Sequence, residues 1–322
     1  MPRPICTLVH ISDPHFGDRF VIDGEKRWRD VFGRIPGLRH ITKLYPHGYQ
    51  TAGAVAFAVR RILNDRKEKG IPFVVVHTGD LTASGSDAEF SVGITFLRHG
   101  HYLTKTTVCG LRLSDVYNQV PFEVPGNHDL WHRGSPKDHT AFSSHYGGSY
   151  PRSTRINSEA GEVIVYGLDS NRSSLWPHRL ANGEIPAADL ASLCEELDRE
   201  RNSRAIKVVC LHHPLFLPIG APRICGVEIL RLRSREKIAK LLSDAGAHIV
   251  LAGHVHNQQY SKKFSLLQFV AGSMCQINSR PSFWMLDLYP KCVEYAYFHI
   301  PNGEYHFDRD ESLSGYAPYL QP

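Results

Sequence analysis

The fold is decided near the N-terminus, where residues 6–15 are CTLVHISDPH. Thr7–Ile11 is a short apolar run with β-branched residues, which predicts a buried strand. The run ends at Ser12, and Asp13 and His15 follow at once. In α/β sheets, ligands bind just outside the carboxyl ends of the strands. Asp13 and His15 are therefore candidate ligand-binding residues at the end of the first strand.

Similar apolar runs recur downstream, and helical patterns separate them. The runs are Phe73–His77, Pro121–Val124, Val163–Leu168, Ile206–Leu211 and His248–Ala252. Helices are predicted over Thr51–Lys69, from the Ser86/Glu89 capping box to Gly100, from Pro186 onward, and from Ser234 to Gly246. This alternation of strands and helices predicts a layered α/β domain.

The last third of the chain has a different pattern. Ser265–Ala271, Phe283–Tyr289 and Val293–Ile300 follow one another without a helix between them. They are predicted to be consecutive antiparallel strands, so the sheet is mixed or two sheets pack together. Gly17–Gln50 and His99–Gln119 fit no strong period and are expected to be lid or insertion loops. We expect one domain over residues 1–300 and a C-terminal tail over 301–322.

Composition narrows the class of protein. Of the 322 residues, 42% are hydrophobic and 21% are charged, which is typical of a globular chain. The net charge of +5 is too small to indicate nucleic-acid binding. The seven cysteines form no Cys-x-x-Cys pair. With no signal peptide and no apolar stretch near about 18 residues, a cytoplasmic protein without a membrane span is expected.

Polar side chains follow five of the predicted strands directly after each strand ends. They are Asp13 and His15; Asp80; Asn127, His128 and Asp129; His212 and His213; and His254 and His256. If these strands are parallel neighbours, all five sets converge on one site. Glycines precede Asp80, Asn127 and His254. We expect these glycines to let the chain turn sharply, so that the next side chain enters the site.

The types of side chain indicate a metal centre. Asp supplies hard oxygen and His supplies imidazole nitrogen, a mixture that suits manganese, iron, zinc or cobalt. No cysteine lies in these motifs, which argues against a structural zinc site. The candidate ligands are Asp13, His15, Asp80, Asn127, His212, His254 and His256. Seven ligands exceed the need of one tetrahedral ion, so two ions sharing a bridging carboxylate are expected.

Five motifs follow one another along the chain: Asp13-x-His15, Gly79-Asp80, Gly126-Asn127-His128-Asp129, His212-x-Pro214 and Gly253-His254-x-His256. In this order they resemble the motifs of the calcineurin-like metallophosphoesterase family, and the resemblance covers residues 5 to about 260. It implies an α/β fold in which two mixed β-sheets pack as a sandwich flanked by helices, in αββα order. The strands of the last third would complete this sandwich.

The resemblance also implies a role for each residue. Asp13, His15 and His256 would hold the first ion. Asp80 would bridge both ions, and Asn127, His212 and His254 would hold the second. His128 would be a catalytic residue that faces the phosphate and acts on the leaving-group oxygen or stabilises the transition state. The implied reaction is phosphoester hydrolysis by a hydroxide that bridges the two metal ions.

Departures from related subfamilies refine this implication. Purple acid phosphatases carry a Tyr ligand where this chain has Ala83. Protein Ser/Thr phosphatases carry Glu where this chain has Asp129, and an Asp-Arg-Gly run where it has Leu81-Thr82-Ala83. The His-His-Pro step and Gly-His-x-His are more similar to bacterial cyclic-nucleotide and glycerophosphodiester phosphodiesterases. A small phosphodiester is therefore the expected substrate.

Four more residues are candidates for contacts near the substrate or behind the ligands. Asp129 would either support a ligand histidine or cap a loop, and His213 would support a ligand. Asp169 and Asn171 end a predicted strand, where they would lie near the substrate or form an Asx-turn.

Three other functions stay open at this point. A phosphomonoesterase would use the same site. A nuclease would need a basic track or stacking surface, and none is evident, so a nucleic-acid partner is not expected. A non-catalytic scaffold of this fold would have lost ligand residues, whereas every ligand position here holds a competent side chain. A homo-oligomer is compatible with the sequence but not indicated by it.

Overall fold

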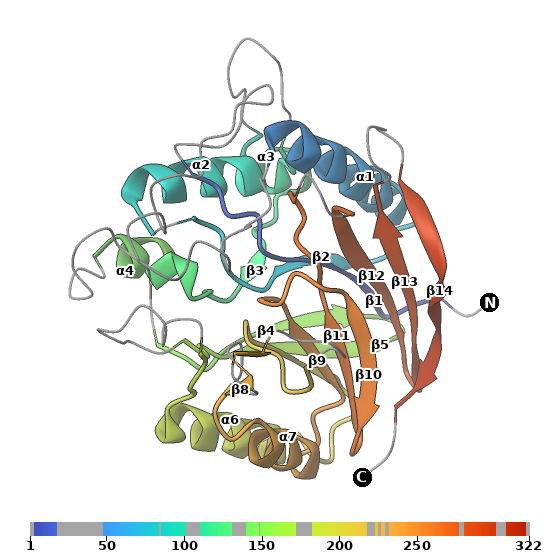
Figure 1. Ribbon diagram of the computed structural model, residues 1–322. Helices are drawn as coiled ribbons and strands as arrows, with labels where there is room; N and C mark the ends of the chain where they lie inside the picture. The colour runs from blue at the N-terminus through green and yellow to red at the C-terminus, as the bar shows by residue number, and fades with distance from the viewer. Residues whose placement is uncertain are drawn as a thin grey trace.

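The computed structural model describes residues 3–17, 48–83, 85–100, 110–130, 140–147, 149–171, 182–217, 223–224, 227–228, 232–276, 280–300 and 307–319. Within this part of the chain, two six-stranded sheets pack face to face and helices cover both outer sides (Figure 1). The predicted αββα sandwich is thereby confirmed. Most of the predicted lid at 17–50, and residues 101–109 of the predicted loop at 99–119, lie outside the described residues.

The first sheet contains the N-terminal strand and the C-terminal strands. Its members are β1 (Cys6–Ile11), β2 (Phe73–His77), β3 (Phe122–Glu123), β12 (Ser282–Tyr289), β13 (Cys292–His299) and β14 (Asp308–Pro318). Their order is β14-β13-β12-β1-β2-β3. Strands β1, β2 and β3 are parallel, whereas β12, β13 and β14 continue the sheet in antiparallel pairs.

The second sheet is built from the middle of the chain. Its members are β4 (Arg152–Ser158), β5 (Gly161–Gly167), β6 (Ile206–Cys210), β9 (Ile249–Ala252), β10 (Gln259–Lys263) and β11 (Leu266–Val270). Their order is β10-β11-β9-β6-β5-β4, with a parallel centre and an antiparallel strand at each edge. A separate two-stranded ribbon pairs β7 (Arg223–Ile224) with β8 (Val227–Glu228).

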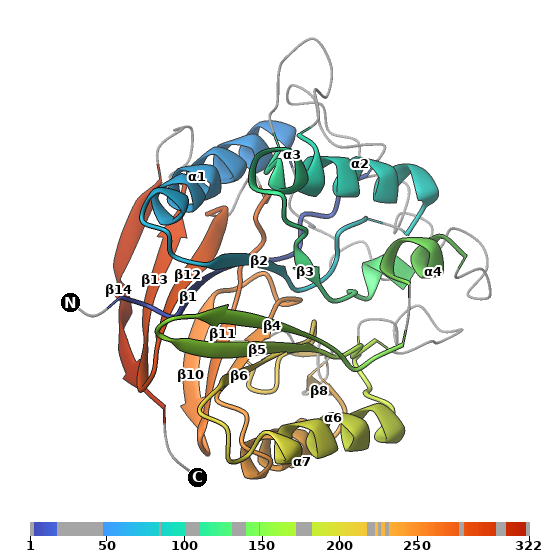
Figure 2. The same ribbon diagram turned by 180° about the vertical axis from the view of Figure 1, so that it is seen from behind.

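Helices occupy the two outer faces (Figures 1 and 2). The first sheet is covered by α1 (Tyr49–Glu68), α2 (Asp87–Arg98) and α3 (Leu113–Tyr117). The second sheet is covered by α6 (Ala187–Arg199) and α7 (Arg235–Asp244). Two short elements, η2 (His128–Leu130) and α4 (Thr140–Tyr146), follow β3. The capping box predicted at Ser86 is present, because Ser86 and Glu89 exchange hydrogen bonds at the start of α2.

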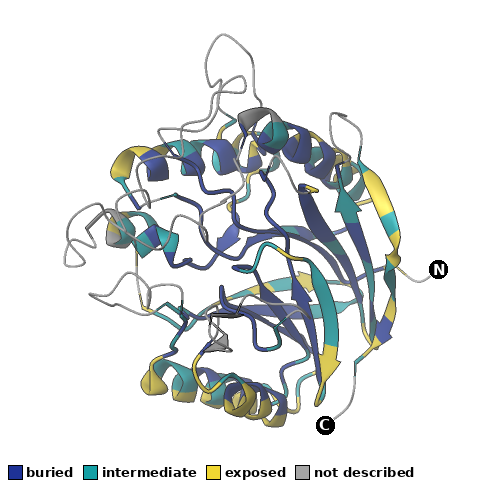
Figure 3. Cartoon of the chain, viewed as in Figure 1, coloured by how far each residue is buried: buried dark blue, intermediate teal, exposed yellow. Residues whose placement is uncertain are grey.

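Three apolar layers hold the sandwich together, and the alternation of side chains along β1 explains two of them. Leu8 faces the second sheet and packs in the core between the sheets. Val9 and Ile11 face the opposite way, against α1 and α2. The third layer lies between the second sheet and α6 and α7. Figure 3 shows that the central strands are buried, whereas the edges and the outer helix faces are exposed.

The structure corrects three predictions. The strand predicted at Ser265–Ala271 is β11, which pairs in parallel with β9 in the second sheet and not with β12. The segment 301–322, expected to be a tail, contains β14, an edge strand paired with β13. Part of the loop expected at 99–119 is the helix α3. The partner of β11 is set by contacts between residues distant in sequence. The edge strand β14 is polar, so it has no apolar run from which a strand could be predicted.

Two smaller predictions can also be compared with the structure. The described cysteines Cys6, Cys194, Cys210, Cys275 and Cys292 are all free thiols. None of the helices in the described ranges combines the length and apolar character that a membrane span requires.

Candidate metal centre

The candidate ligands lie at the carboxyl ends of strands from both sheets. Asp13 follows β1 and Asp80 follows β2, both in the first sheet. His212 follows β6 and His254 follows β9, both in the second sheet. The predicted convergence therefore occurs, but not among neighbours in one sheet. Because the two sheets face each other, their strand ends form opposite walls of a single site.

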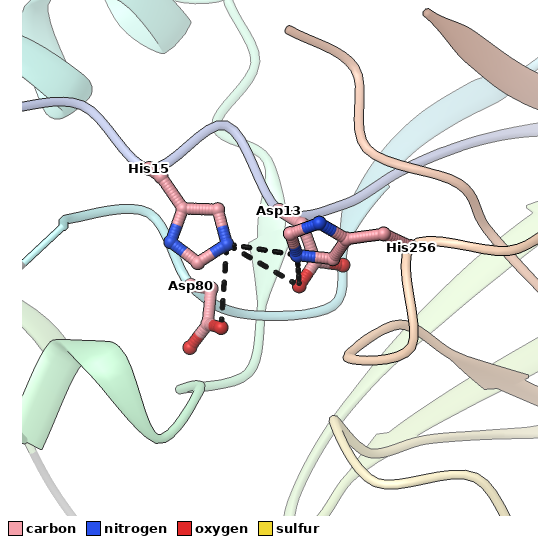
Figure 4. Close-up of side chains that lie close together, drawn as sticks. All are labelled: Asp13, His15, Asp80 and His256. Atoms are coloured by element: carbon pink, nitrogen blue, oxygen red, sulfur yellow. Dashed lines mark hydrogen bonds and ion pairs between the residues drawn. The ribbon is translucent and has the colours of Figure 1, made fainter. Parts of the chain in front are cut away.

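The first group of candidate ligands contains Asp13, His15, Asp80 and His256, whose potential ligand atoms all lie within 4.8 Å of one another. Figure 4 shows that the two imidazole rings point toward the carboxylates. The Nε2 atoms of His15 and His256 are 2.9 Å apart. Nε2 of His256 lies 3.3 Å from Asp13 Oδ1, and Nε2 of His15 lies 3.8 Å from the same oxygen.

The second group contains Asp80, His212 and His254, and it lies beside Asn127. The His212 Nε2 atom is 3.1 Å from His254 Nδ1 and 3.1 Å from the Oδ1 atom of Asn127. All four residues are at least nine-tenths buried. The two histidines of the second group and the adjacent Asn127 therefore present two nitrogens and an amide oxygen to the same point in the protein interior.

Asp80 connects the two groups through one oxygen atom. Its Oδ2 lies 3.6 Å from Nε2 of His15 and 3.4 Å from Nε2 of His212. Its other oxygen, Oδ1, accepts a hydrogen bond of 2.8 Å from the His128 backbone N–H. This second contact fixes the orientation of the carboxylate, so that Oδ2 stays between the two groups.

These separations fit ions held between the side chains. Ligand atoms bound at about 2.1 Å to one ion lie about 3.0 Å apart at an octahedral centre and about 3.4 Å apart at a tetrahedral one. The distances within the two groups span 2.9–3.8 Å. Oxygen and imidazole donors together suit manganese, iron, zinc or cobalt. The residues present could therefore hold two ions.

The electrostatics of the carboxylates also favour a cation. Burial opposes the ionisation of Asp80, but the nearby imidazoles of His212 and His128 hold its pKa well below the usual range. Burial acts likewise on Asp13, and the imidazole of His256 keeps its pKa low. Two ionised carboxylates thus lie close together in a buried site, and their repulsion is relieved by positive charge.

The pKa values of the two histidines in the second group, His212 and His254, shift in opposite directions. Burial disfavours the charged form of His212, but the Asp80 carboxylate raises its pKa to about 9. Burial lowers the pKa of His254 to about 3, with the charge of His212 acting in the same direction. The Nδ1 atom of His212 is 2.7 Å from the Thr78 carbonyl oxygen. Donation to this carbonyl turns Nε2 toward Asp80 and Asn127.

Strained backbone places most of these side chains. Positive φ angles occur at Asp13 (52°), His15 (49°), Asp80 (54°), His254 (73°) and His256 (51°). This region costs a non-glycine residue of order 1–3 kcal/mol, and such strain concentrates at functional sites. Hydrogen bonds extend the pairing of β1 and β2 beyond the strands, from Asp13 N–H to the Gly79 carbonyl and from His15 N–H to the Asp80 carbonyl. These bonds hold the strained residues in place.

Glycines next to the ligands allow the two walls to approach closely. A Cβ atom on Gly126 would overlap the backbone nitrogen and the carboxylate of Asp80. A Cβ atom on Gly253 would overlap Ser12 and the carboxylate of Asp13. Of the three glycines expected to turn the chain, Gly79 has a φ of +97°, whereas Gly126 and Gly253 have no positive φ. Their role is to leave room for an aspartate from another motif.

His128 lies at the edge of the first group. Its ring centroid is 4.6 Å from that of His15, and the two rings are nearly perpendicular. The Nδ1 atom is 2.9 Å from the Ala83 carbonyl oxygen, which makes Nδ1 the protonated nitrogen of the neutral ring. His128 is half-buried, in contrast to Asp80 beside it.

The comparison with protein families agrees with this geometry. The family model described as calcineurin-like phosphoesterase matches residues 6–258. The chain belongs to this family. All seven candidate ligands and His128 fall inside the matched residues.

Relatives of this phosphoesterase are distant. A probable cyclic nucleotide phosphodiesterase of Rhodococcus erythropolis is 24% identical over 283 residues, which cover 85% of this chain and 72% of that protein. A dimetal phosphatase of Danio rerio superposes with a TM-score of 0.62 at 13% identity, covering 98% of this chain and all of that one. GAP50, the anchor in the inner membrane complex of Plasmodium, superposes with a TM-score of 0.50 at 12% identity, with coverages of 95% and 89%. At such identities the two structures show the fold alone.

Asp129 holds two loops of the phosphoesterase together. Its Oδ1 accepts hydrogen bonds of 2.8 and 2.9 Å from the backbone and hydroxyl of Thr82. Its Oδ2 accepts from the Gly126 N–H at 2.9 Å and from the Tyr146 hydroxyl at 3.2 Å. Burial and the charge of Asp80 raise the pKa of Asp129 to about 7. Of the two predicted roles, these contacts are those of a loop cap.

The remaining candidates lie close to the ligands without joining them. The His213 ring centroid is 4.3 Å from that of His254, and its Nδ1 is 2.9 Å from the Ser170 hydroxyl. Asp169 Oδ1 accepts from the backbone and side-chain nitrogens of Asn171, which is the Asx-turn. The Asn171 amide also donates to the Pro125 carbonyl at 3.0 Å, one residue before Gly126.

Sequence reasoning missed three supporting residues. Thr78 orients His212 through its carbonyl, and the Ser273 hydroxyl donates to the Asp13 carbonyl at 2.7 Å. Tyr146 donates to Asp129 from α4. Thr78 could have been found, since it lies between β2 and Asp80. Ser273 and Tyr146 carry no sequence signal, because their partners are distant in the chain.

Proposed function

We propose that this phosphoesterase is a dinuclear metal-dependent enzyme that hydrolyses a small phosphodiester. The observation that carries the proposal is the position of Asp80 Oδ2. This oxygen lies 3.6 Å from Nε2 of His15 in the first group and 3.4 Å from Nε2 of His212 in the second. A carboxylate oxygen between two sets of ligands is what a bridged pair of ions requires.

Each proposed ligand has a place in this scheme. Asp13, His15 and His256 would hold one ion, and Asp80 would contact both. The other ion would be held by Asn127, His212 and His254. When bound, the ions would activate water as the nucleophile and counter the charge of the phosphoryl oxygens.

His128 is the proposed catalytic residue. The Ala83 carbonyl accepts from Nδ1, so a proton for a phosphoester would come from the opposite nitrogen, Nε2, which carries one when the ring is an imidazolium. The backbone N–H of His128 bonds to Asp80, which ties the position of the ring to the bridging carboxylate. A proton delivered to the leaving-group oxygen is worth about 10²–10⁴-fold in rate.

The choice of a diester has support from the relative in Rhodococcus erythropolis, whose name is that of a cyclic nucleotide phosphodiesterase. The match spans 85% of this chain. The dimetal phosphatase and the anchor protein share the fold and supply no substrate for this chain. An anchor-like role is disfavoured, because every proposed ligand position holds a residue that can bind metal.

The test is a substrate panel in the presence of manganese. It contains bis-p-nitrophenyl phosphate, p-nitrophenyl phosphate, cyclic AMP, a glycerophosphodiester and single-stranded DNA. We expect diester turnover that chelation removes and manganese restores. Monoester turnover far above diester turnover would refute the diester assignment, and dominant DNA cleavage would indicate a nuclease. A protein that purifies with little transition metal and shows no chelator-sensitive activity would be a scaffold.

A further inference from the structure

The loop after β3, residues 125–129, is attached to the first sheet by a very short strand. In the described part of the chain, β3 has two residues and lies at the edge of its sheet, where it pairs with β2 alone. One bond from the Val124 N–H to the His77 carbonyl extends this pairing. Beyond Val124, the proposed ligand Asn127 has to reach His212 on the opposite sheet. Its position therefore depends on what holds the loop from that side.

A segment of the second sheet packs against this loop. Strand β5 ends at Gly167, and a Cβ atom there would lie 3.0 Å from Cγ1 of Val124. The Leu168 N–H donates to the Cys210 carbonyl at 2.9 Å, which extends the pairing of β5 with β6 by one residue. We call the next three residues, Asp169–Asn171, the brace. The brace thus begins on the second sheet at a point where the two sheets touch.

Two neighbouring residues of the brace bond to opposite walls of the metal centre. The Ser170 hydroxyl oxygen accepts from the backbone N–H of His213 at 3.1 Å and lies 2.9 Å from its Nδ1. The Asn171 Nδ2 atom donates to the Pro125 carbonyl at 3.0 Å. His213 directly follows a proposed ligand of the second wall, and Pro125 lies two residues before one of the first wall. The brace therefore links the two ligand-bearing segments.

The Asn171 side chain can make its bonds in one orientation only. Nδ2 also donates to Asp169 Oδ1 at 2.7 Å, and the same oxygen accepts from the Asn171 backbone N–H at 2.8 Å. Both neighbours of the amide are acceptors, so its NH₂ group has to face them. The Asn171 Oδ1 atom is buried and has no hydrogen-bond partner among the described residues, which costs free energy. An asparagine held at this cost indicates that the two donors are what the position requires.

The bond to Pro125 bears on the second ion more than on the first. The second ion would take an oxygen from Asn127 on one wall and nitrogens from His212 and His254 on the other. Metal–ligand distances of about 2.1 Å tolerate about 0.2 Å of deviation, so the spacing of the walls decides whether both sides can bind. Within the described residues, the hydrogen bonds of the brace reach none of the segments that carry the three ligands of the first ion alone.

We propose that Asn171 is a positioning residue for the second metal ion. Through the Pro125 carbonyl it holds Asn127 at the distance from His212 at which both contact one ion. The inference rests on the proposed function, because it needs a dinuclear site. It assigns Asn171 no contact with the substrate or with either ion.

Manganese titration of the metal-free protein, followed by electron paramagnetic resonance, tests this role. Anomalous peak heights in crystals soaked at limiting manganese assign each dissociation constant to one ion. Asn171→Ala should raise the dissociation constant of the ion beside His212 by about 10–100-fold, the usual loss when a residue that orients a ligand is removed. The constant of the ion beside His15 should stay close to the wild-type value. Asn171→Leu fills the space without donors and should weaken the same ion, which separates lost hydrogen bonds from lost volume.

A second measurement needs no metal. In the metal-free protein, the His128 N–H, which bonds to Asp80, should exchange with solvent faster in Asn171→Ala than in the wild type, because the loop has lost a restraint. The matched control is Asn157→Ala, at an exposed asparagine on β4. It should match the wild type in both measurements. Thermal unfolding verifies that each variant is folded.

The outcomes separate this proposal from the proposed function. Wild-type affinity for both ions in Asn171→Ala or Asn171→Leu, or unchanged exchange at His128, would overturn the proposal and leave the dinuclear site intact. Equal weakening of both ions would overturn it as well, since the brace would then only stabilise the fold. A wild-type protein that binds no ion beside His212 would refute the proposed function, and the role of Asn171 with it.

Discussion

Substituting alanine for Gly126 should disable the site without touching any proposed ligand. The added Cβ would overlap the backbone nitrogen and Oδ1 of Asp80 and would lie 2.8 Å from its Cγ. Ordinary carbon–carbon contact begins at about 3.5 Å, so the carboxylate has to move by about 0.7 Å or more. A displacement near 1 Å at a catalytic group can cost about 10²-fold. We therefore expect kcat/KM to fall by about 10²-fold, with an overpacking cost of about 1–3 kcal/mol in stability.

The assay is hydrolysis of bis-p-nitrophenyl phosphate with manganese, together with metal content by mass spectrometry and thermal unfolding. Gly246→Ala is the matched control, because a Cβ at Gly246, just after α7, meets nothing within 4 Å. Its φ of +92° makes the control substitution destabilising by local strain, but turnover should stay at the wild-type level. Wild-type turnover and metal content in Gly126→Ala would refute the reasoning, since Asp80 would then tolerate displacement.

Three other substitutions follow from individual contacts. His128→Ala should lower kcat by about 10²–10⁴-fold and leave the metal content unchanged, and loss of metal would contradict a purely catalytic role. Tyr146→Phe removes the hydrogen bond to Asp129 and should cost about 0.5–1.5 kcal/mol in urea unfolding; an unchanged midpoint would show that this bond contributes nothing. Burial lowers the pKa of His248 to about 4 from 6.5, so the unfolded state binds more protons between these values. Stability should therefore fall as the pH falls through this window, by up to about 3 kcal/mol from this group. His248→Gln should flatten that part of the pH dependence of the urea midpoint, and an unchanged pH dependence would exclude His248 as its source.

The sequence predicted the strands that precede the candidate ligands well, because those strands are buried on both faces. Phe73–His77 was predicted at its observed bounds, and the strand before Asp13 differs by one residue. Edge strands were missed for the opposite reason. Residues 152–158 of β4 alternate between partly buried and exposed positions, and β10 and β14 are polar, so none of them forms an apolar run.

The motifs predict a set of candidate ligands, but they do not predict its geometry. Asp13 and His254 lie in different sheets, and their contact depends on the packing of one sheet on the other. The positive φ angles of the ligands also escaped prediction, because neither Asp nor His signals such a conformation in the way that glycine does. Asp129 illustrates the same limit. Its motif position favoured no single role, and only its contacts with Thr82 and Tyr146 distinguish a loop cap from a partner of a histidine.

The central claim is that Asp80 bridges two metal ions, and anomalous diffraction from crystals grown with manganese tests it most directly. The account predicts two anomalous peaks per chain, one beside His15 and one beside His212, with Asp80 Oδ2 between them. In crystals of Asp80→Asn, at least one peak should weaken or vanish, because the amide lacks the negative charge that holds both ions. A single peak in the wild type, or two peaks of which only one contacts Asp80, would contradict the account.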